Sequence, residues 1–278
     1  MSSRRTGLEP LSVARYRGGV REFVDDRVAL EEPLEIRIAG EPFAVTMRTP
    51  GHDEELVLGL LLAEGIVRCV GDVGGIAHCG KPGELGNVID VTAAPGTVID
   101  WEPDGPVRRA TLTTSACGVC GRRSIDDLLA RVRPLDDGAR FSARWIERLT
   151  RELAPRQVNF SASGGVHAAA LFHAEGAASE SSLLVREDVG RHNAVDKVVG
   201  RAALDGDLPA RGRALVVSGR ASFELVQKAL VAQIPMLVSV SAPSSLAVAA
   251  ARAAGLTLVG FARGERFNVY AGEERIRS

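Results

Sequence analysis

The first part of the chain alternates apolar and polar residues over short stretches. Alternation at 34–38 and 43–47 predicts two strands around a turn at 39–41. The apolar run at 52–67 predicts a helix, with acidic residues in its first turn and Gly65 at its end. Residues 86–93 and 107–114 predict further strands, so this part is α+β. The first twenty residues show no such pattern and predict a loosely held arm.

The second part of the chain repeats a different pattern, in which nearly continuous apolar stretches alternate with amphipathic ones. Ser124 and Ser142 each precede an amphipathic run and predict helix starts. Strands are predicted at 167–173, 213–219, 235–240 and 256–262, and helices at 191–204, 222–233 and 245–255. Strands of this kind predict strand–helix–strand crossovers and a sheet covered on both faces.

These patterns predict an α/β fold in which a smaller α+β domain precedes a layered α/β domain. Within 278 residues we expect a flexible arm at 1–20, the smaller domain at 21–115 and the α/β domain at 116–278. The last of these begins with a mobile loop that holds a C-x-x-C pair.

Composition and charge exclude several classes of protein. The chain is 45% hydrophobic and 25% charged, with a formal net charge of −1, which argues against a general nucleic-acid binder. No apolar run approaches the ~20 residues that span a bilayer, so no membrane association is expected. The N-terminus has two arginines but no apolar stretch behind them, so it is not a secretory signal. We therefore expect a cytoplasmic protein.

Polar residues gather where the predicted strands of the second part end. In open α/β sheets such strand ends line the ligand crevice, and helix N-termini there favour anions. Any one of these loops is explained by helix capping, but three of them with arginines favour a phosphate-bearing ligand. None matches a P-loop or a dinucleotide-binding fingerprint. The candidate binding residues are Ser218, Gly219, Arg220, Ser244, Phe261, Ala262, Arg263, Gly264, Glu265 and Arg266.

One short span, 186–197, concentrates charged and polar side chains at the start of a predicted helix. A charged helix start is usually a solvated face. His192 and Asn193, however, follow an apolar strand near the same predicted edge. The sequence favours a functional role and a solvated face equally, and His192 is a candidate binding residue.

The pair Cys117 and Cys120 is compatible with a metal site, a redox disulfide, a sulfur carrier or no role. Structural zinc needs about four ligands, and the spacing of Cys69 and Cys79 is poor for metal, so no metal site is predicted. A zinc deaminase would place its H-x-E before the cysteines, whereas His173 and Glu175 follow them. A thioredoxin-like pair begins a helix, but glycine and two arginines keep this pair in a loop. Those arginines favour a thiolate, and an exposed, mobile thiolate suits a carrier.

Eight ordered segments are spread nearly from end to end of the chain: "EPLEIRI", "MRTPGHDEELVLGLLLAEGI", "SACGVCG", "GGVHAAALF", "REDVGRHNAVDKVVG", "VVSGRASFELVQKAL", "SAPSSLAVAAA" and "LTLVGFARGERFNVY". In these segments the chain resembles the formate dehydrogenase accessory sulfurtransferase family (FdhD). Two departures are His52, where an acidic residue is expected, and Ala116, where serine is expected.

The resemblance implies a sulfurtransferase with a cysteine persulfide intermediate. Such a protein takes sulfur from a cysteine desulfurase and delivers it to the molybdenum bis-molybdopterin guanine dinucleotide cofactor before its insertion into formate dehydrogenase. It also implies a cytidine deaminase-like fold without zinc, a homodimer, Cys117 as carrier and residues 261–266 as part of the cofactor site. The cofactor is then the bound substrate. Our own hypothesis for sulfur release is that Cys120 attacks the Cys117 persulfide and leaves a Cys117–Cys120 disulfide.

Two other functions fit some of the same residues. One is a chaperone that binds and protects the cofactor without transferring sulfur. The other is a dithiol oxidoreductase, which would act on a general disulfide and bind no cofactor.

Overall fold

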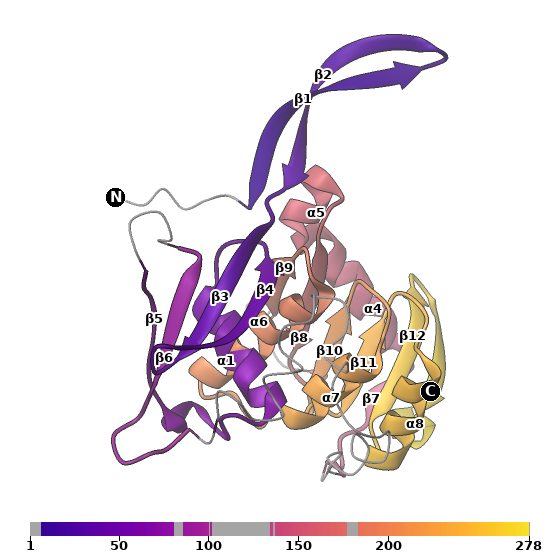
Figure 1. Cartoon of the computed structure of the whole chain (residues 1–278). Coiled ribbons are helices and arrows are strands. Elements are labelled where there is room, and N and C mark those ends of the chain that lie inside the picture. The colour runs from indigo at the N-terminus through magenta and orange to yellow at the C-terminus, as the bar shows by residue number, and fades with distance from the viewer. Residues whose placement is uncertain are drawn as a thin grey trace.

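A six-stranded sheet forms the centre of the second part of the chain (Figure 1). The computed structural model describes residues 7–80, 86–99, 101, 134–135, 137–176 and 183–277. The strand order is β13-β12-β11-β10-β8-β9, with β10, β11 and β12 parallel and the outer pairs antiparallel. The strands are β8 (His167–Phe172), β9 (Leu184–Asp188), β10 (Ala214–Val217), β11 (Met236–Ser239), β12 (Thr257–Arg263) and β13 (Arg266–Ala271).

Helices cover both faces of this sheet, as the apolar strands predict. Alternate side chains such as Leu215 and Leu237 belong to one buried cluster, together with residues of α6 (Arg191–Leu204), α7 (Phe223–Val231) and α8 (Ser245–Ala254). The neighbouring Val216 and Val238 belong to a second cluster with α4 (Ala143–Leu153). Ser142 caps α4 by accepting a hydrogen bond from Trp145 N at 3.1 Å, which confirms the predicted helix start.

The first part of the chain contributes a four-stranded sheet and a long helix. The sheet has the order β4-β3-β6-β5, from β3 (Glu32–Ile38), β4 (Glu41–Arg48), β5 (Val73–His78) and β6 (Val88–Ala93). The helix α1 (Asp53–Glu64) has an acidic first turn and ends at Gly65 in the left-handed conformation, both as predicted.

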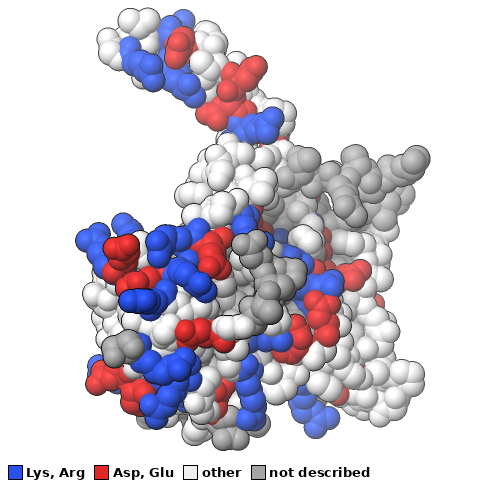
Figure 2. Space-filling view, turned by 180° about the vertical axis from the view of Figure 1, so that it is seen from behind, with Lys and Arg blue, Asp and Glu red and all other residues white. Residues whose placement is uncertain are grey.

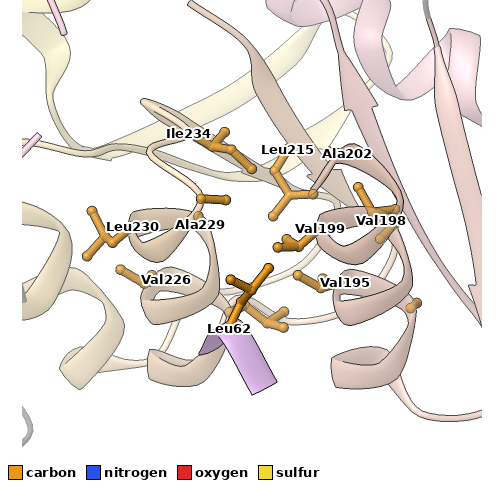
Figure 3. Close-up of a cluster of buried hydrophobic side chains, with 14 of the residues drawn as sticks. Leu62, Val195, Val198, Val199, Ala202, Leu215, Val226, Ala229, Leu230 and Ile234 are labelled. Carbon is orange, nitrogen blue, oxygen red and sulfur yellow. The ribbon is translucent and has the colours of Figure 1, made fainter. Parts of the chain in front are cut away.

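Helix α1 crosses α6 at two glycines, Gly59 and Gly200. A Cβ on Gly59 would lie 2.6 Å from the carbonyl carbon of Asp196, and one on Gly200 would lie 2.7 Å from that of Glu55. Only hydrogen atoms fit between backbones this close. The crossing brings Leu62 of α1 against Val195 and Val199 of α6 and onto α7 (Figure 3), so one core cluster includes residues from both parts. The predicted domain boundary at 115 and 116 lies outside the described residues.

Residues 8–29 form a β-hairpin, whereas the sequence pattern predicted no strand in the first twenty residues. Strand β1 (Leu8–Arg17) pairs with β2 (Val20–Ala29) over ten residues, around a turn at Gly18 and Gly19. The hairpin projects from the body, and the short helix α5 (Val158–Ser163) lies at its base (Figure 1). The remaining short elements are η1 (Val70–Asp72), β7 (Phe141–Ser142), η2 (Ala154–Arg156), η4 (Glu273–Arg275) and β14 (Ile276–Arg277).

Buried ion pairs join α1 to the rest of the fold. Arg186 on β9 donates two hydrogen bonds to the Glu55 carboxylate, at 2.5 and 2.8 Å. Arg48, at 1% exposure, makes a two-bond contact with Asp53 at 3.0 Å for each bond. These pairs fix the start of α1 between the two sheets. Among the described helices, none is long and apolar enough to cross a bilayer.

We expect acid to weaken the fold partly through Glu55. Burial alone would raise the pKa of this carboxyl, but Arg186 and His52 outweigh it and lower the pKa to about 2. Relative to the ordinary value of 4.5, this pair contributes on the order of 3 kcal/mol above pH ~4.5, lost as the pH falls toward ~2. Urea unfolding from pH 6 to pH 3 should therefore show a smaller loss of stability in Glu55→Gln than in wild type. Glu54→Gln, at an exposed neighbour, should behave as wild type. An equal loss of unfolding free energy between pH 6 and pH 3 in all three proteins would contradict the role assigned to Glu55.

Candidate functional site

The loops that follow β10 and β11 meet at one edge of the six-stranded sheet. Ala221 and Pro243 form an isolated bridge, and Ser244 N donates to Ala221 O at 2.9 Å. The buried Ser239 hydroxyl lies 2.7 Å from Gly219 O and accepts a hydrogen bond from Ser241 N at 3.0 Å. One side chain therefore holds both loops in a fixed relation.

The residues 261–266 join the same edge through β12. Phe261 N donates to Ser241 O at 3.1 Å, and Arg263 Nε donates to Val240 O at 3.1 Å. Gly264 and Glu265 form the turn between β12 and β13, and both are exposed. The structure therefore brings together the three loops that the sequence predicted to meet.

Not every predicted binding residue can offer its side chain to a ligand. The Ala262 side chain is 2% exposed and belongs to the core, so only its backbone is available. Ser218 Oγ accepts from Ala168 N, and Ser244 Oγ accepts from Ala247 N and so caps α8. Arg220, Arg263 and Arg266 are exposed at this edge and give it its positive charge, and Phe261 beside them is exposed as well.

His192, near the start of α6, packs against the loop after β10. Its Nε2 lies 2.6 Å from Glu224 Oε2 and 3.3 Å from Ser222 Oγ, which come from the start of α7. Deeper in the fold, Asp196 and Lys228 form a buried ion pair at 2.6 Å. Burial raises the pKa of Asp196 to about 6, although the charge of Lys228 opposes the rise. The predicted proximity of His192 to the edge is confirmed.

Two further residues, His167 and Arg191, line this edge. A Cβ on Gly219 would lie 3.3 Å from His167 Nδ1 and 3.6 Å from Arg191 Cδ, so both side chains line the loop. Burial lowers the pKa of His167, and the charges of Arg191 and His192 lower it further, so its imidazole is neutral at pH 7. Among the residues that the structure describes, none accepts a hydrogen bond from the buried Arg191 Nε. In the sequence, His167 lies within the segment "SGGVH" and Arg191 within "VGRHN", and these polar segments could have pointed to both residues.

Other charged residues of the span 186–197 are structural rather than solvated. Asp188 is fully buried and lies 2.7 Å from Lys197 Nζ, which also donates to Thr49 O at 2.8 Å. Asp188 further accepts from Thr49 N and from Asn193 Nδ2, both at 3.1 Å. This network fixes the start of α6 against the first part of the chain. Neither of the two predicted interpretations, a ligand site or a solvated face, describes Asp188 and Lys197.

The predicted carrier Cys117 and its neighbour Cys120 lie outside the described residues. In the part of the chain that the structure describes, no group of three metal-ligating side chains comes together. Cys69 is exposed and Cys79 half-buried, and both are free thiols. His78 lies 3.3 Å from Asp53 Oδ2, so it belongs to the network at the start of α1.

Replacing Ser239 with alanine should loosen the edge. The substitution leaves Gly219 O and Ser241 N without their buried partner, which costs about 1–3 kcal/mol. We expect lower thermal stability together with weaker binding of an anionic ligand at the edge, measured by calorimetry. Ser245→Ala, at an exposed serine of the neighbouring helix, is the control. Unchanged stability and binding in Ser239→Ala would contradict this role.

Comparisons with known proteins agree on one family. The family model described as FdhD/NarQ matches residues 29–277. Proteins named "Sulfur carrier protein FdhD" are 53% identical in Anaeromyxobacter dehalogenans strain 2CP-C, covering 95% of this chain and 92% of that protein, and 48% identical in Streptomyces avermitilis, covering 96% and 95%. A crystal structure from Desulfotalea psychrophila, of a protein assigned as a formate dehydrogenase accessory protein, has a TM-score of 0.77 at 28% identity. The match covers 98% of this chain and 100% of that one.

Proposed function

Since the chain belongs to the FdhD/NarQ family, we propose that it is a sulfur carrier in the maturation of formate dehydrogenase. It moves sulfur from a cysteine desulfurase to the molybdenum bis-molybdopterin guanine dinucleotide cofactor, which is its substrate. The observation that supports this most strongly is the meeting of three Ser, Gly and Arg loops at one sheet edge, in a chain that also holds a C-x-x-C pair.

Sulfur loading is an exchange at Cys117. Its thiolate attacks the terminal sulfur of the desulfurase persulfide, so that a new S–S bond forms on Cys117 and the desulfurase leaves as a thiolate. The two arginines that follow the pair, Arg122 and Arg123, favour the thiolate form of the attacking group.

Sulfur release requires two electrons, and Cys120 supplies them. Its thiolate attacks the Cys117 sulfur, the terminal sulfur leaves as sulfide and becomes a ligand of the metal, and a Cys117–Cys120 disulfide remains. A thiol reductant then regenerates both thiols for the next cycle.

The sheet edge suits a cofactor with pyrophosphate and guanine groups. Arg220, Arg263 and Arg266 offer exposed guanidinium groups, which bind phosphate oxygens in pairs. The start of α7 adds backbone N–H groups that favour an anion. His167 and His192 add neutral or paired imidazoles beside these cations. We also propose, from the family resemblance, that the second part of the chain has a cytidine deaminase-like fold.

Transfer of labelled sulfur separates this function from its rivals. Protein loaded with radiolabelled persulfide is mixed with sulfur-depleted cofactor, and label is then measured on each. Sulfur transfer predicts label on the cofactor and activation of apo formate dehydrogenase. A cofactor chaperone predicts binding while the label stays on the protein. A dithiol oxidoreductase predicts reduction of a general disulfide and no cofactor binding.

A further inference from the structure

The hairpin β1–β2 has no part in the sheet-edge site, and both its faces are largely exposed. Tyr16, Val20 and Phe23 near its tip are 67%, 70% and 69% exposed. An isolated two-stranded hairpin is at best marginally stable in water, and exposed apolar side chains add to that cost. A ten-residue hairpin of this kind would therefore be stabilised by a second surface that covers its exposed apolar side chains.

The charges of the hairpin separate along its length. Toward the tip lie Arg15, Arg17 and Arg21 with one acid, Glu22; toward the base lie Glu9, Asp25 and Asp26 with one base, Arg27. Figure 2 shows the same division, with blue side chains toward the tip and a red group nearer the body. Arg15 and Asp26 are 3.9 Å apart and about half exposed, so this internal pair leaves the separation intact.

A groove of about 780 Å³ lies between the base of the hairpin and α5. It is lined by Pro10, Leu11, Ser12, Asp25, Asp26, Arg27 and Ala162. Two carboxylates and one guanidinium line the groove, so it carries a net negative charge. The tip, with Arg15, Arg17 and Arg21 against Glu22, carries a net positive charge that complements it.

We propose that the hairpin is a dimerisation arm that covers the hairpin of a second copy in antiparallel orientation. A twofold axis near Val13 and Val24, at the middle of the ribbon, places each tip over the other copy's base. Each basic tip then meets the partner's acidic groove, and the exposed apolar side chains on the covered face of each tip become buried. The family resemblance implies a homodimer; the charge pattern adds which surface forms it and how the copies are oriented.

Charge exchange between copies tests this arrangement in the full-length protein. One variant reverses the tip (Arg17→Glu with Arg21→Glu), and another reverses the base (Asp25→Arg with Asp26→Arg). Like charges then face each other, so each variant alone should show a dimer dissociation constant about 100-fold or more above wild type. An equimolar mixture should form heterodimers, since the reversed tip now faces the reversed base. Sedimentation velocity at low ionic strength measures all three.

A matched control reverses two exposed arginines on α4, Arg144→Glu with Arg148→Glu, and should dimerise as wild type. Circular dichroism melting checks that every variant is folded. A monomeric wild type, dimeric single-sided variants, or a mixture that stays monomeric would each overturn the proposal. Dimerisation through the hairpin does not depend on sulfur transfer. Persulfide loading of the same variants is measured separately, so failure of one proposal is distinguished from failure of the other.

Discussion

Replacing Gly59 with alanine should destabilise the protein by about 3 kcal/mol or more, at the upper end of overpacking effects. In an open helix the same change would stabilise by roughly 1 kcal/mol, because alanine is the better helix former. Here the added methyl group would overlap the backbone of Asp196 on α6. Relief requires α1 and α6 to separate, which opens the core around Leu62 and Val199. The sign of the effect thus reports directly on the helix crossing.

Urea unfolding of wild type and Gly59→Ala measures this difference. Gly200→Ala disrupts the same crossing, so the double variant should lose less than the sum of the two single losses. Gly138→Ala is the control, because a Cβ there meets nothing within 4 Å. A gain of stability in Gly59→Ala would show that the two helices do not pack as described.

Replacing Cys117 with alanine should abolish activation of formate dehydrogenase. In the proposed mechanism the persulfide forms on the Cys117 sulfur, so the residual activity should fall to background rather than decrease partially. The measurement is formate oxidation in cells that lack the native gene and carry each variant. Cys69→Ala, which removes an exposed thiol elsewhere, should retain full activity. Activity of Cys117→Ala at the wild-type level would contradict the assignment of the carrier.

Cys120→Ala separates loading from release. If Cys120 is the resolving thiol, this variant still accepts sulfur but delivers it more slowly, so persulfide accumulates on the protein. Equal rates of delivery in wild type and Cys120→Ala would instead assign release to an external thiol.

The sequence predicts the body of this fold well because its apolar periodicity is strong. The parallel strands β10 to β12 are nearly continuous in apolar residues, and clear caps mark the starts of two helices, Ser142 for α4 and Ser244 for α8. Once strands are parallel, the loops after them must meet at one edge, which is why the placement of Ser218–Arg220 and Phe261–Arg266 could be predicted.

The hairpin and the buried charges were harder to predict for physical reasons. The hairpin β1–β2 is exposed on both faces within one chain, so it lacks the alternation that marks a half-buried strand. Asp188 and Lys197 look solvated in sequence because only the tertiary fold brings Thr49, far away in the chain, to them as a buried partner. Arg191 and His167 likewise become neighbours of Gly219 through the sheet, across separate elements.

Sulfur carriage by Cys117 is the central claim, and intact-protein and peptide mass spectrometry test it most directly. The protein is incubated with a cysteine desulfurase and cysteine, then exposed to sulfur-depleted cofactor. The account predicts a mass gain of one sulfur atom on the peptide that holds Cys117, and its loss when cofactor is added. A protein that gains no sulfur, or gains it equally when Cys117 is alanine, would contradict the account.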